Sequence, residues 1–510
     1  MRRVAISAGS RIAADAAANV ADHGGNAVDA AIAATITGMC TGPGIIAPGG
    51  SAFITIWPPL GGPVVIDAYA EMPGRGLSDP PAEFGDRAVM TYGGGMETLV
   101  GHGSVATPGA FAGLGAASQE YGSMPWAEVM APAVDWARQG FPLSWTSASY
   151  LTYAHQPIFD KQPDSHRALH HDDGTPLLEG ERVLIEGLAD ALQTIADHGP
   201  GVLYAGEIGR VMAEDMAAHG GRLTADDLAA YRPIRRRPIV VQADEWQVAT
   251  NPAPAIGGAV MAAILLLVDD HSFTEWTGEE LRRLAAMQRS VLEYRGRHLD
   301  DAGDREAAVE SLLETARLGD HQRLLDSPST IHTSVVDTDG LACAITTSAG
   351  YGSGVMIPGT GIWLNNSLGE LELQPGGPGA LQPGTRLVSN MAPTVARRPD
   401  GAILAIGSPG AGRITTAISQ VLLNFIHLGM SLSEAVEYPR LHVEIFEGVP
   451  TIAHEPGLLV AGFDGMQVRR FPDLSMYFGG VGVAMHDPAA GLYQVADSRR
   501  ALGVASGGSA

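Results

Sequence analysis

The fold is decided by one stretch of the sequence, Ser329-Thr330-Ile331-His332-Thr333-Ser334-Val335-Val336-Asp337-Thr338-Asp339-Gly340-Leu341-Ala342-Cys343-Ala344-Ile345-Thr346-Thr347-Ser348. β-Branched residues dominate its first half, and such residues favour strands. Asp339-Gly340 is typical of a tight turn, and a second β-rich run follows it. The stretch therefore predicts a β-hairpin.

The register of this hairpin decides which hydroxyl groups meet. If Asp337 and Gly340 flank the turn, Thr330 faces Thr347. A bulge in the turn would instead bring Ser348 opposite Thr330. Either register gathers hydroxyl groups where the first strand begins. Hydroxyl side chains are also common on exposed strand edges, so the hairpin alone does not establish a catalytic site.

The rest of the chain mixes helices and strands without a βαβ rhythm. Residues 11–40 predict a helix pair broken by glycines, and residues 277–325 predict a long charged helical stretch. Residues 361–365 and 402–406 predict strands, and a helix should follow the Gly-rich turn at 407–412. This pattern indicates an α+β layered fold.

Composition excludes several classes of function. The 510 residues carry 32 Lys+Arg against 56 Asp+Glu, a formal charge of −24, which disfavours binding to nucleic acid or anionic membranes. Lys161 is the only lysine, so a Walker A loop is excluded and a Schiff-base lysine is disfavoured. We expect no cofactor.

Neither a membrane span nor a disulfide is expected. The longest apolar run, residues 255–268, is shorter than the ~18 residues that cross a bilayer and predicts a core helix. No secretory signal is visible, and we expect a cytoplasmic protein. Cys40 and Cys343 lie far apart and fit buried thiols rather than a disulfide or zinc site.

One histidine-rich run also raises the question of a metal. It contains His166, His170, His171, Asp172 and Asp173. We interpret it as a solvated loop, so no metal site is predicted.

The Gly-rich turn is a candidate anion site. It reads Ala405-Ile406-Gly407-Ser408-Pro409-Gly410-Ala411-Gly412-Arg413, a strand followed by a turn and the start of a helix. Such a turn presents backbone N–H groups and a helix N-terminus to an anion, which could be a phosphate or an oxyanion. It is not a nucleophile elbow, because Ile406 stands where that motif requires glycine.

Taken together, these motifs resemble the γ-glutamyltranspeptidase family. The resemblance spans nearly the whole chain and rests on the hairpin and the turn, with further matches in both halves. These are Gly24-Gly25-Asn26-Ala27-Val28-Asp29-Ala30-Ala31, Thr107-Pro108-Gly109, Tyr121-Gly122-Ser123-Met124-Pro125, Leu223-Thr224, Asp227-Leu228-Ala229, Leu364-Asn365-Asn366, Met391, Pro393-Thr394 and Asp497-x-Arg499.

The resemblance implies a self-processing enzyme. Family members are N-terminal-nucleophile hydrolases with a four-layer αββα sandwich, whose precursor cleaves itself before the nucleophile. Here the cut would fall between Ser329 and Thr330, giving a large subunit of residues 1–329 and a small subunit of residues 330–510 that form one domain. The implied substrate is a small amide, cleaved through an acyl-enzyme. A homodimer of the processed heterodimer is left open.

The family's site residues carry over position by position. Thr330 matches the nucleophile, and Ser348 matches a threonine that hydrogen-bonds it. Gly410 and Ala411 match the two glycines whose N–H groups form the oxyanion hole. The substrate-binding candidates are Glu370, which matches an aspartate for the substrate α-amino group, together with Asn366, Ser389 and Asn390. His332, close to the nucleophile, is expected to make a structural hydrogen bond.

Two departures change the expected substrate. Ala70 stands where the family has an arginine for the substrate α-carboxylate, and Gly350 stands where it has an asparagine. We therefore expect an amide that is not a standard γ-glutamyl compound. Two alternatives stay open. One is a true γ-glutamyl hydrolase or transferase that anchors the carboxylate through Arg386, Arg413 or Tyr69. The other is an uncleaved, inactive homologue that serves as a binding protein.

Overall fold

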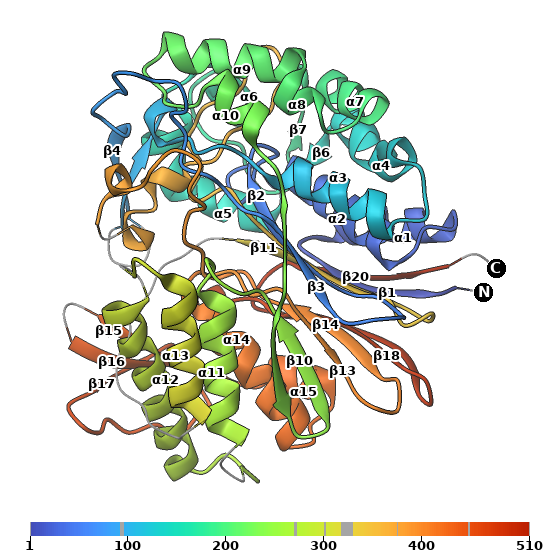
Figure 1. Ribbon diagram of the computed structural model, residues 1–510, viewed down its shortest axis with the longest axis vertical. Coiled ribbons are helices and arrows are strands. Elements are labelled where there is room, and N and C mark those ends of the chain that lie inside the picture. The colour runs from blue at the N-terminus through green and yellow to red at the C-terminus, as the bar shows by residue number, and fades with distance from the viewer. Residues whose placement is uncertain are drawn as a thin grey trace.

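The computed structural model describes residues 2–91, 96–269, 273–299, 302–317, 330–374, 376–446 and 449–508. Two antiparallel sheets lie face to face at the centre of the molecule, and helices cover the outer face of each (Figure 1). The expected α+β fold, a four-layer αββα sandwich, is confirmed.

The first sheet, drawn in the upper half of Figure 1, contains strands from both ends of the chain. The first and last described strands are neighbours in it, which brings the two termini together. In spatial order its strands are β20 (Gly503–Gly507), β1 (Val4–Ala8), β11 (Ile331–Asp337), β12 (Ala342–Ser348), β2 (Ser51–Trp57), β3 (Val64–Ala68) and β8 (Ile234–Arg236).

The second sheet lies below the first and begins where the chain crosses over after β8 (Figure 1). Its strands, again in spatial order, are β19 (Gly491–Ala496), β18 (Gly482–Asp487), β14 (Ile403–Gly407), β13 (Thr394–Arg397), β10 (Trp246–Thr250) and β9 (Ile239–Ala243).

Small side chains pack the two sheets against each other. Ala5, Ala342 and Ala344 from the first sheet share a buried cluster with Ala405 and Ala484 from the second. Because alanine adds little bulk, the two backbones can approach closely, and the start of β11 comes near the end of β14. These strand ends carry the candidate nucleophile and the Gly-rich turn.

The first sheet is covered by helices from the N-terminal half of the chain. Asn26 caps the second of these helices through a capping box with Asp29, as the break at residues 23–26 predicts. The helices on this side are α1 (Arg11–Asp22), α2 (Ala27–Thr41), α3 (Ala110–Tyr121), α4 (Trp126–Gln139), α5 (Trp145–Ala154), α6 (Pro163–Leu169), α7 (Leu188–His198), α8 (Val202–Ala205), α9 (Glu207–Ala218) and α10 (Ala225–Ala230).

The second sheet is covered by α11 (Gly257–Asp269), α12 (Gly278–His298), α13 (Arg305–Arg317), α14 (Arg413–Leu422) and α15 (Leu432–Glu437). The apolar run at residues 255–268 is a buried core helix, as predicted. Within the described chain, no helix is long and apolar enough to cross a membrane. The stretch 277–325 forms two helices rather than one, and residues 318–325 lie outside the described residues.

The hairpin between β11 and β12 has the bulged register. Ile331 pairs with Thr347, which places Thr330 opposite Ser348, so the register without a bulge is wrong by one residue. The turn is longer than that register assumes, because the N–H of Asp337 donates to the carbonyl of Leu341 at 3.0 Å. Gly340 adopts a φ of 83° in this turn, a conformation that glycine accepts without strain.

Smaller elements complete the chain. The expected strand at residues 361–365 is wrong, because Trp363 and Leu364 make only isolated bridges. Cys40 and Cys343 are buried and unpaired, as predicted. The remaining strands are β4 (Asp86–Met90), β5 (Met96–Val100), β6 (Phe141–Pro142), β7 (Arg182–Val183), β15 (Leu441–Phe446), β16 (Val449–His454) and β17 (Gln467–Arg470).

Candidate active site

Thr330 stands directly before the first residue of β11 and is almost completely buried, with 3% of its surface exposed. Its neighbour across the hairpin is Ser348, which is equally buried. The Ser348 hydroxyl oxygen accepts a hydrogen bond from the N–H of Gly350 at 3.1 Å. Ser51 pairs with Ser348 on the next strand, so hydroxyl groups from three strand positions gather here.

The Gly-rich turn follows β14 and leads into α14, as predicted. Gly410 adopts a φ of 127°, and Ala411 adopts a φ of 67°, which is unusual for a residue with a Cβ atom. Among the described residues, no acceptor takes a hydrogen bond from the backbone N–H of Gly410 or Ala411. The turn can therefore direct two N–H groups and a helix N-terminus at an anion.

His332 connects the nucleophile strand to this turn. Ser334 donates its hydroxyl hydrogen to the carbonyl of Gly482, so it accepts from Nε2–H of His332, at 2.7 Å. Nδ1 of His332 then accepts from the hydroxyl of Thr346, at 2.8 Å. Burial lowers the pKa of His332 to about 3, so the ring is neutral. The expected structural role is confirmed.

The His332 ring also explains Gly407. A Cβ atom at Gly407 would lie 2.3 Å from the ring, so a larger residue would displace either the histidine or the turn. Direct contact between the His332 ring and Gly407 thus sets the distance between β11 and the Gly-rich turn.

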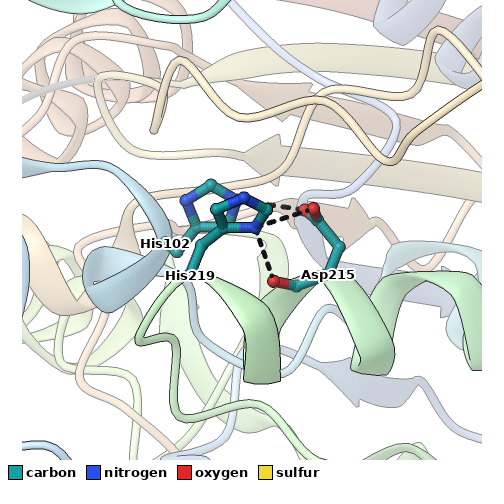
Figure 2. A group of neighbouring side chains, drawn as sticks. All are labelled: His102, Asp215 and His219. Atoms are coloured by element: carbon teal, nitrogen blue, oxygen red, sulfur yellow. Dashed lines mark hydrogen bonds and ion pairs between the residues drawn. The ribbon is translucent and has the colours of Figure 1, made fainter.

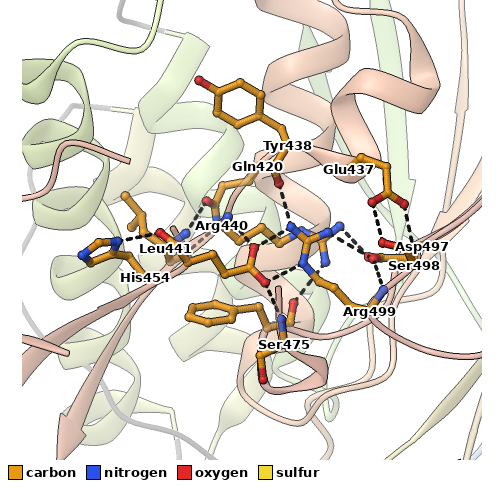
Figure 3. Close-up of polar contacts among 12 residues, drawn as sticks. Gln420, Glu437, Tyr438, Arg440, Leu441, His454, Ser475, Asp497, Ser498 and Arg499 are labelled. Atoms are coloured by element: carbon orange, nitrogen blue, oxygen red, sulfur yellow. Dashed lines mark hydrogen bonds and ion pairs between the residues drawn. The ribbon is translucent and has the colours of Figure 1, made fainter. Parts of the chain in front are cut away.

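A buried ion network supports the far side of the turn (Figure 3). The side chains of Arg499, Glu455 and Asp497 are completely buried, and Arg499 contacts both carboxylates, Asp497 at 3.1 Å. Asp497 also accepts from the N–H of Val481 at 2.8 Å, and the N–H of Gly480 donates to Ser408 Oγ at 3.0 Å. The network therefore holds the loop that packs directly on the turn.

A small pocket of about 40 Å³ opens beside Thr330 and Gly410. Its walls combine aromatic and apolar side chains with two guanidinium groups. The other lining residues are Ile45, Met90, Tyr150, Tyr153, Tyr351, Arg413, Met476 and Arg500.

The segment 476–481, which packs on the Gly-rich turn, also positions the two guanidinium groups of the pocket. Arg413 Nε donates to the carbonyl of Tyr477 at 3.0 Å, and its guanidinium lies 4.6 Å from the Tyr477 ring centroid. Arg500 Nη2 donates to the carbonyl of Met476 at 3.3 Å. The pocket thus has a positive end made by charges that α14 and the C-terminal segment supply.

The predicted substrate-binding residues do not line this pocket, and two of them lie beside Gly350. None of Glu370, Asn366, Ser389 and Asn390 is among the described residues that line it. A Cβ atom at Gly350 would lie 2.2 Å from Asn366 Oδ1 and 3.3 Å from the Glu370 carboxyl carbon, so these side chains are adjacent. The amide nitrogen of Asn366 is engaged with β5, donating to the carbonyl of Leu99 at 2.9 Å.

Glu370 is the unusual group of this cluster. It is 2% exposed, and burial together with the nearby Glu372 raises its pKa well above the ordinary value. Tyr69, close to Glu370 and hydrogen-bonded to Ser389, also has a raised pKa because it is buried.

The γ-glutamyltranspeptidase family model matches residues 13–507. The chain belongs to this family. It is 29% identical over 458 residues to the glutathione hydrolase proenzyme of Escherichia coli (strain K12), covering 83% of this chain and 78% of that protein. It is also 29% identical over 459 residues to the acylase ACY 1 proenzyme of Pseudomonas sp. (strain V22), covering 85% and 81%.

Solved structures agree with this membership. Cephalosporin acylase from Bacillus halodurans matches with a TM-score of 0.79 at 24% identity, covering 99% of this chain and 96% of that chain, which shows a shared fold. The γ-glutamyltranspeptidase from Pseudomonas nitroreducens matches with a TM-score of 0.51 at 26% identity, covering 60% and 91%.

Within the family, the two departures of this chain are also structural. Ala70 is completely buried in an apolar cluster with Phe53, Tyr69 and Met72, so an arginine there would have to displace packed side chains. Gly350 has a φ of 60° and contacts Asn366, as described above. The space next to both positions is occupied, so restoring either side chain requires neighbouring residues to move.

The alternative anchors differ in availability. Arg386 is buried and engaged by the carboxylates of Asp67 and Glu71 at 3.6 and 3.3 Å, so it is not poised to bind a substrate. Arg413 lines the pocket. Sequence reasoning missed Tyr150, Met476 and Arg500, because no local motif marks them and only the tertiary fold brings them to Thr330.

Proposed function

We propose that this chain is the precursor of an N-terminal-threonine amidohydrolase that cleaves itself before Thr330. The proposal is supported by the placement of Thr330, which starts the central strand β11, is buried and lines a pocket together with Gly410. Several family relatives are named proenzymes. Ser329, on the other side of the proposed cut, lies outside the described residues.

Cleavage would create the catalytic base. A free α-amino group has a reference pKa of about 7.7–8.0, so part of it is neutral near pH 7. The amino group of Thr330 would take the hydroxyl proton as the oxygen attacks the amide carbon, and would return that proton to the leaving amine. Water would then attack the acyl-enzyme, unless an acceptor amine takes the acyl group.

The supporting residues have distinct roles in this proposal. The Ser348 hydroxyl, opposite Thr330, would orient the nucleophile by a hydrogen bond. The N–H groups of Gly410 and Ala411 would stabilise the oxyanion of the tetrahedral intermediate. Ala411 keeps its N–H, and its positive φ gives it the backbone conformation that glycine would otherwise supply.

We infer that the substrate is a small amide whose acyl group is not a standard γ-glutamyl group. Burying the α-carboxylate of a γ-glutamyl group without a partner would cost several kcal/mol, and the positions of the two family anchors are occupied by Ala70 and Gly350. The pocket beside Thr330 instead offers tyrosine and methionine surface with Arg413 and Arg500. It suits an acyl chain with an apolar middle and an anionic end.

A series of p-nitroanilides tests this inference. γ-Glutamyl and glutaryl anilides differ only by the α-amino group, a 4-aminobutyryl anilide lacks the carboxylate, and a butyryl anilide lacks both. We expect the glutaryl compound to have the highest kcat/KM, because its carboxylate can reach Arg413 and Arg500. The γ-glutamyl compound should have a much lower value, because the same pose would place its cationic α-amino group beside these two guanidinium groups. The Arg500→Ala variant should lower kcat/KM for the glutaryl anilide and leave the butyryl anilide nearly unchanged.

The second candidate is a true γ-glutamyl hydrolase or transferase. Arg413 is the observation that favours it, since Arg413 lines the pocket and could pair with an α-carboxylate. Sequence identity does not decide between the two candidate functions, because the glutathione hydrolase and the acylase are both 29% identical to this chain. Efficient turnover of the γ-glutamyl anilide that falls in Arg413→Ala would establish this candidate instead.

An uncleaved binding homologue is the third alternative. A chain that stays whole after purification and is inactive on the entire series would establish it. The cytoplasmic location and the homodimer stay predictions.

A further inference from the structure

We propose that Asp160, His166 and His170 bind a divalent transition-metal ion at a site separate from the active site. One ligand atom from each side chain lies within 4.8 Å of the other two. Imidazole nitrogen combined with carboxylate oxygen is a donor set that suits zinc and neighbouring metals. The ion would brace the wall of the substrate pocket and take no part in the reaction.

The histidines belong to a helix, so the interpretation of this run as a solvated loop is wrong for them. His166 lies on α6, and His170 is the residue that ends it. Two histidines four residues apart on one helix face can present both rings to a single metal ion. Their rings are stacked, with centroids 4.3 Å apart and planes 8° from parallel, so the partly exposed His166 ring would have to turn before both rings point at one ion.

The hydrogen bonds fix the state of His170. Its Nδ1 lies 3.0 Å from the carbonyl oxygen of His166 and donates to it, which leaves a lone pair on Nε2. Histidine ligands of metals commonly have their second nitrogen held in this way.

Two further groups complete the surroundings. Asp160 Oδ1 lies 2.6 Å from Nδ1 of His166. Nδ1 of His155 lies 3.2 Å from Nε2 of His170 and donates its hydrogen to it, a hydrogen bond that an incoming ion would replace. Two nitrogen ligands of one tetrahedral zinc ion are about 3.3 Å apart when each Zn–N distance is about 2.0–2.1 Å. Asp160 and His166 are partly exposed, so an ion can enter from solvent.

A second cluster provides a contrast (Figure 2). It contains His102, Asp215 and His219, whose ligand atoms are also close together. Nδ1 of His219 lies 3.0 Å from both the carbonyl and the carboxylate of Asp215, so its hydrogen already has acceptors. Gln162 Nε2 lies 3.4 Å from Nε2 of His102. Both clusters contain hydrogen bonds, but the histidines of this one come from two separate segments rather than from one helix, and it serves as the control site.

The first cluster is connected to the active site through α6. Ser165 on this helix donates to the carbonyl of Gly354 at 2.6 Å and accepts from the Trp363 indole at 2.7 Å. The loop that it holds begins just after Tyr351, which lines the pocket. Fixing α6 with an ion should therefore stabilise this wall of the pocket.

Zinc titration of the tag-free, metal-stripped protein tests the proposal. We expect isothermal titration calorimetry to detect one tight Zn²⁺ site per chain and Tm to rise on binding. His166→Ala should weaken that site by roughly 100-fold or more, and because the His166 side chain is 37% exposed the variant should still fold. His170→Ala should have the same effect, with circular dichroism verifying the fold.

Two matched controls locate the ion. His171→Ala removes the next histidine, which is exposed and paired with Glu181 at 3.1 Å, and should bind Zn²⁺ like the wild type. The double variant His102→Ala, His219→Ala should also keep the tight site. The proposal is overturned if the wild type shows no saturable Zn²⁺ binding, if His166→Ala binds as tightly as the wild type, or if the double variant loses the site.

Discussion

The two sides of the proposed active site differ in the kind of group on which they depend. The proposed nucleophile side consists of Thr330, Ser348 and the turn at 407–412, where hydroxyl groups and backbone N–H groups meet. The proposed recognition side consists of Glu370 together with Ala70 and Gly350, two positions where the resemblance predicts anchors and where packed neighbours occupy the adjacent space. A step that depends on backbone N–H groups can tolerate a change of side chain at those positions. Recognition that depends on a single side chain is lost when that side chain is replaced.

The largest effect should come from removing the nucleophile. Thr330→Ala should abolish both self-cleavage and amidase activity, because no other group would be placed to attack the amide. Mass spectrometry should show one intact chain, whereas the wild type gives a small subunit that begins Thr330-Ile331-His332. Thr338→Ala, the same substitution in the turn of the hairpin, should leave processing unchanged. An active, uncut wild-type chain would exclude this mechanism.

The next effect concerns the network behind the nucleophile side. Arg499→Ala should lower the free energy of unfolding by about 3–5 kcal/mol, because it leaves the buried carboxylate of Glu455 without its cation, whereas Asp497 keeps Arg440 at 2.6 Å. Urea denaturation in the Thr330→Ala background, where the chain stays whole, measures this change. Arg289→Ala, which removes a partly exposed ion pair with Glu293, should cost less than about 1 kcal/mol. Equal losses in the two variants would contradict the importance of the network.

A smaller effect is expected at Ser348. Ser348→Ala should slow acylation about 10- to 100-fold, which corresponds to the loss of a hydrogen bond worth about 1.5–3 kcal/mol. The measurement is the single-turnover rate of the processed enzyme. Thr347→Val is the matched control, since the Thr347 hydroxyl has no hydrogen-bond partner among the described residues. A similar slowing in both variants would show that the strand, and not the Ser348 hydroxyl, matters.

On the recognition side, Glu370 should make stability depend on pH. Its pKa is raised in the folded protein, so the native state keeps a proton that the unfolded chain releases above about pH 4.3. The wild type should therefore lose stability as pH rises from there through the folded pKa, with a slope of at most about 1.4 kcal/mol per pH unit.

Glu370→Gln should remove this loss, so its advantage over the wild type should grow with pH. Urea midpoints between pH 4 and pH 8 measure it, with the exposed Glu83→Gln as the control that should follow the wild type. An advantage for Glu370→Gln that does not change with pH would show that Glu370 is ionised in the folded chain.

The smallest effect is expected at Ala411. Its φ of 67° is strained for alanine, so Ala411→Gly should stabilise the protein by about 1 kcal/mol at most and keep the activity, because the N–H is retained. Ala405→Gly, in the adjacent strand, should destabilise it. Proline is unsuitable at position 411, because its φ is fixed near −65°. Loss of activity in Ala411→Gly with an intact fold would mean that the methyl group itself is needed.

Local patterns predicted the parts of the molecule that local chemistry determines. The hairpin, the helix after the Gly-rich turn and the cap at Asn26 all follow from residues close in sequence. The hairpin register needed one further fact, the conformation of Gly340, which both candidate turns could accommodate. The bridge positions Trp363 and Leu364 look like a strand because they are apolar and buried, although each makes only an isolated bridge.

The pocket could not be predicted in the same way. Tyr150, Tyr351 and Arg500 come from distant parts of the chain, and no spacing between them signals a common site. The same limit applies to His166 and His170. Their sequence is polar enough to predict a loop, and only the packing of α6 shows that their rings stack. Residues that resemble a family motif could be placed, whereas residues that meet only through topology could not.

The position of β1 has a consequence for how the molecule could be assembled. It lies between β20 and β11, so one strand from the N-terminal part is held by two from the C-terminal part, and severing the chain before Thr330 would leave the halves interlocked. The same arrangement sets Val4 beside Gly507, so a short linker could join the two ends. A circularly permuted gene opened at Thr330 would then place this threonine directly after the initiator methionine. Removal of that methionine would free the reactive amine, and maturation would no longer require the chain to cut itself.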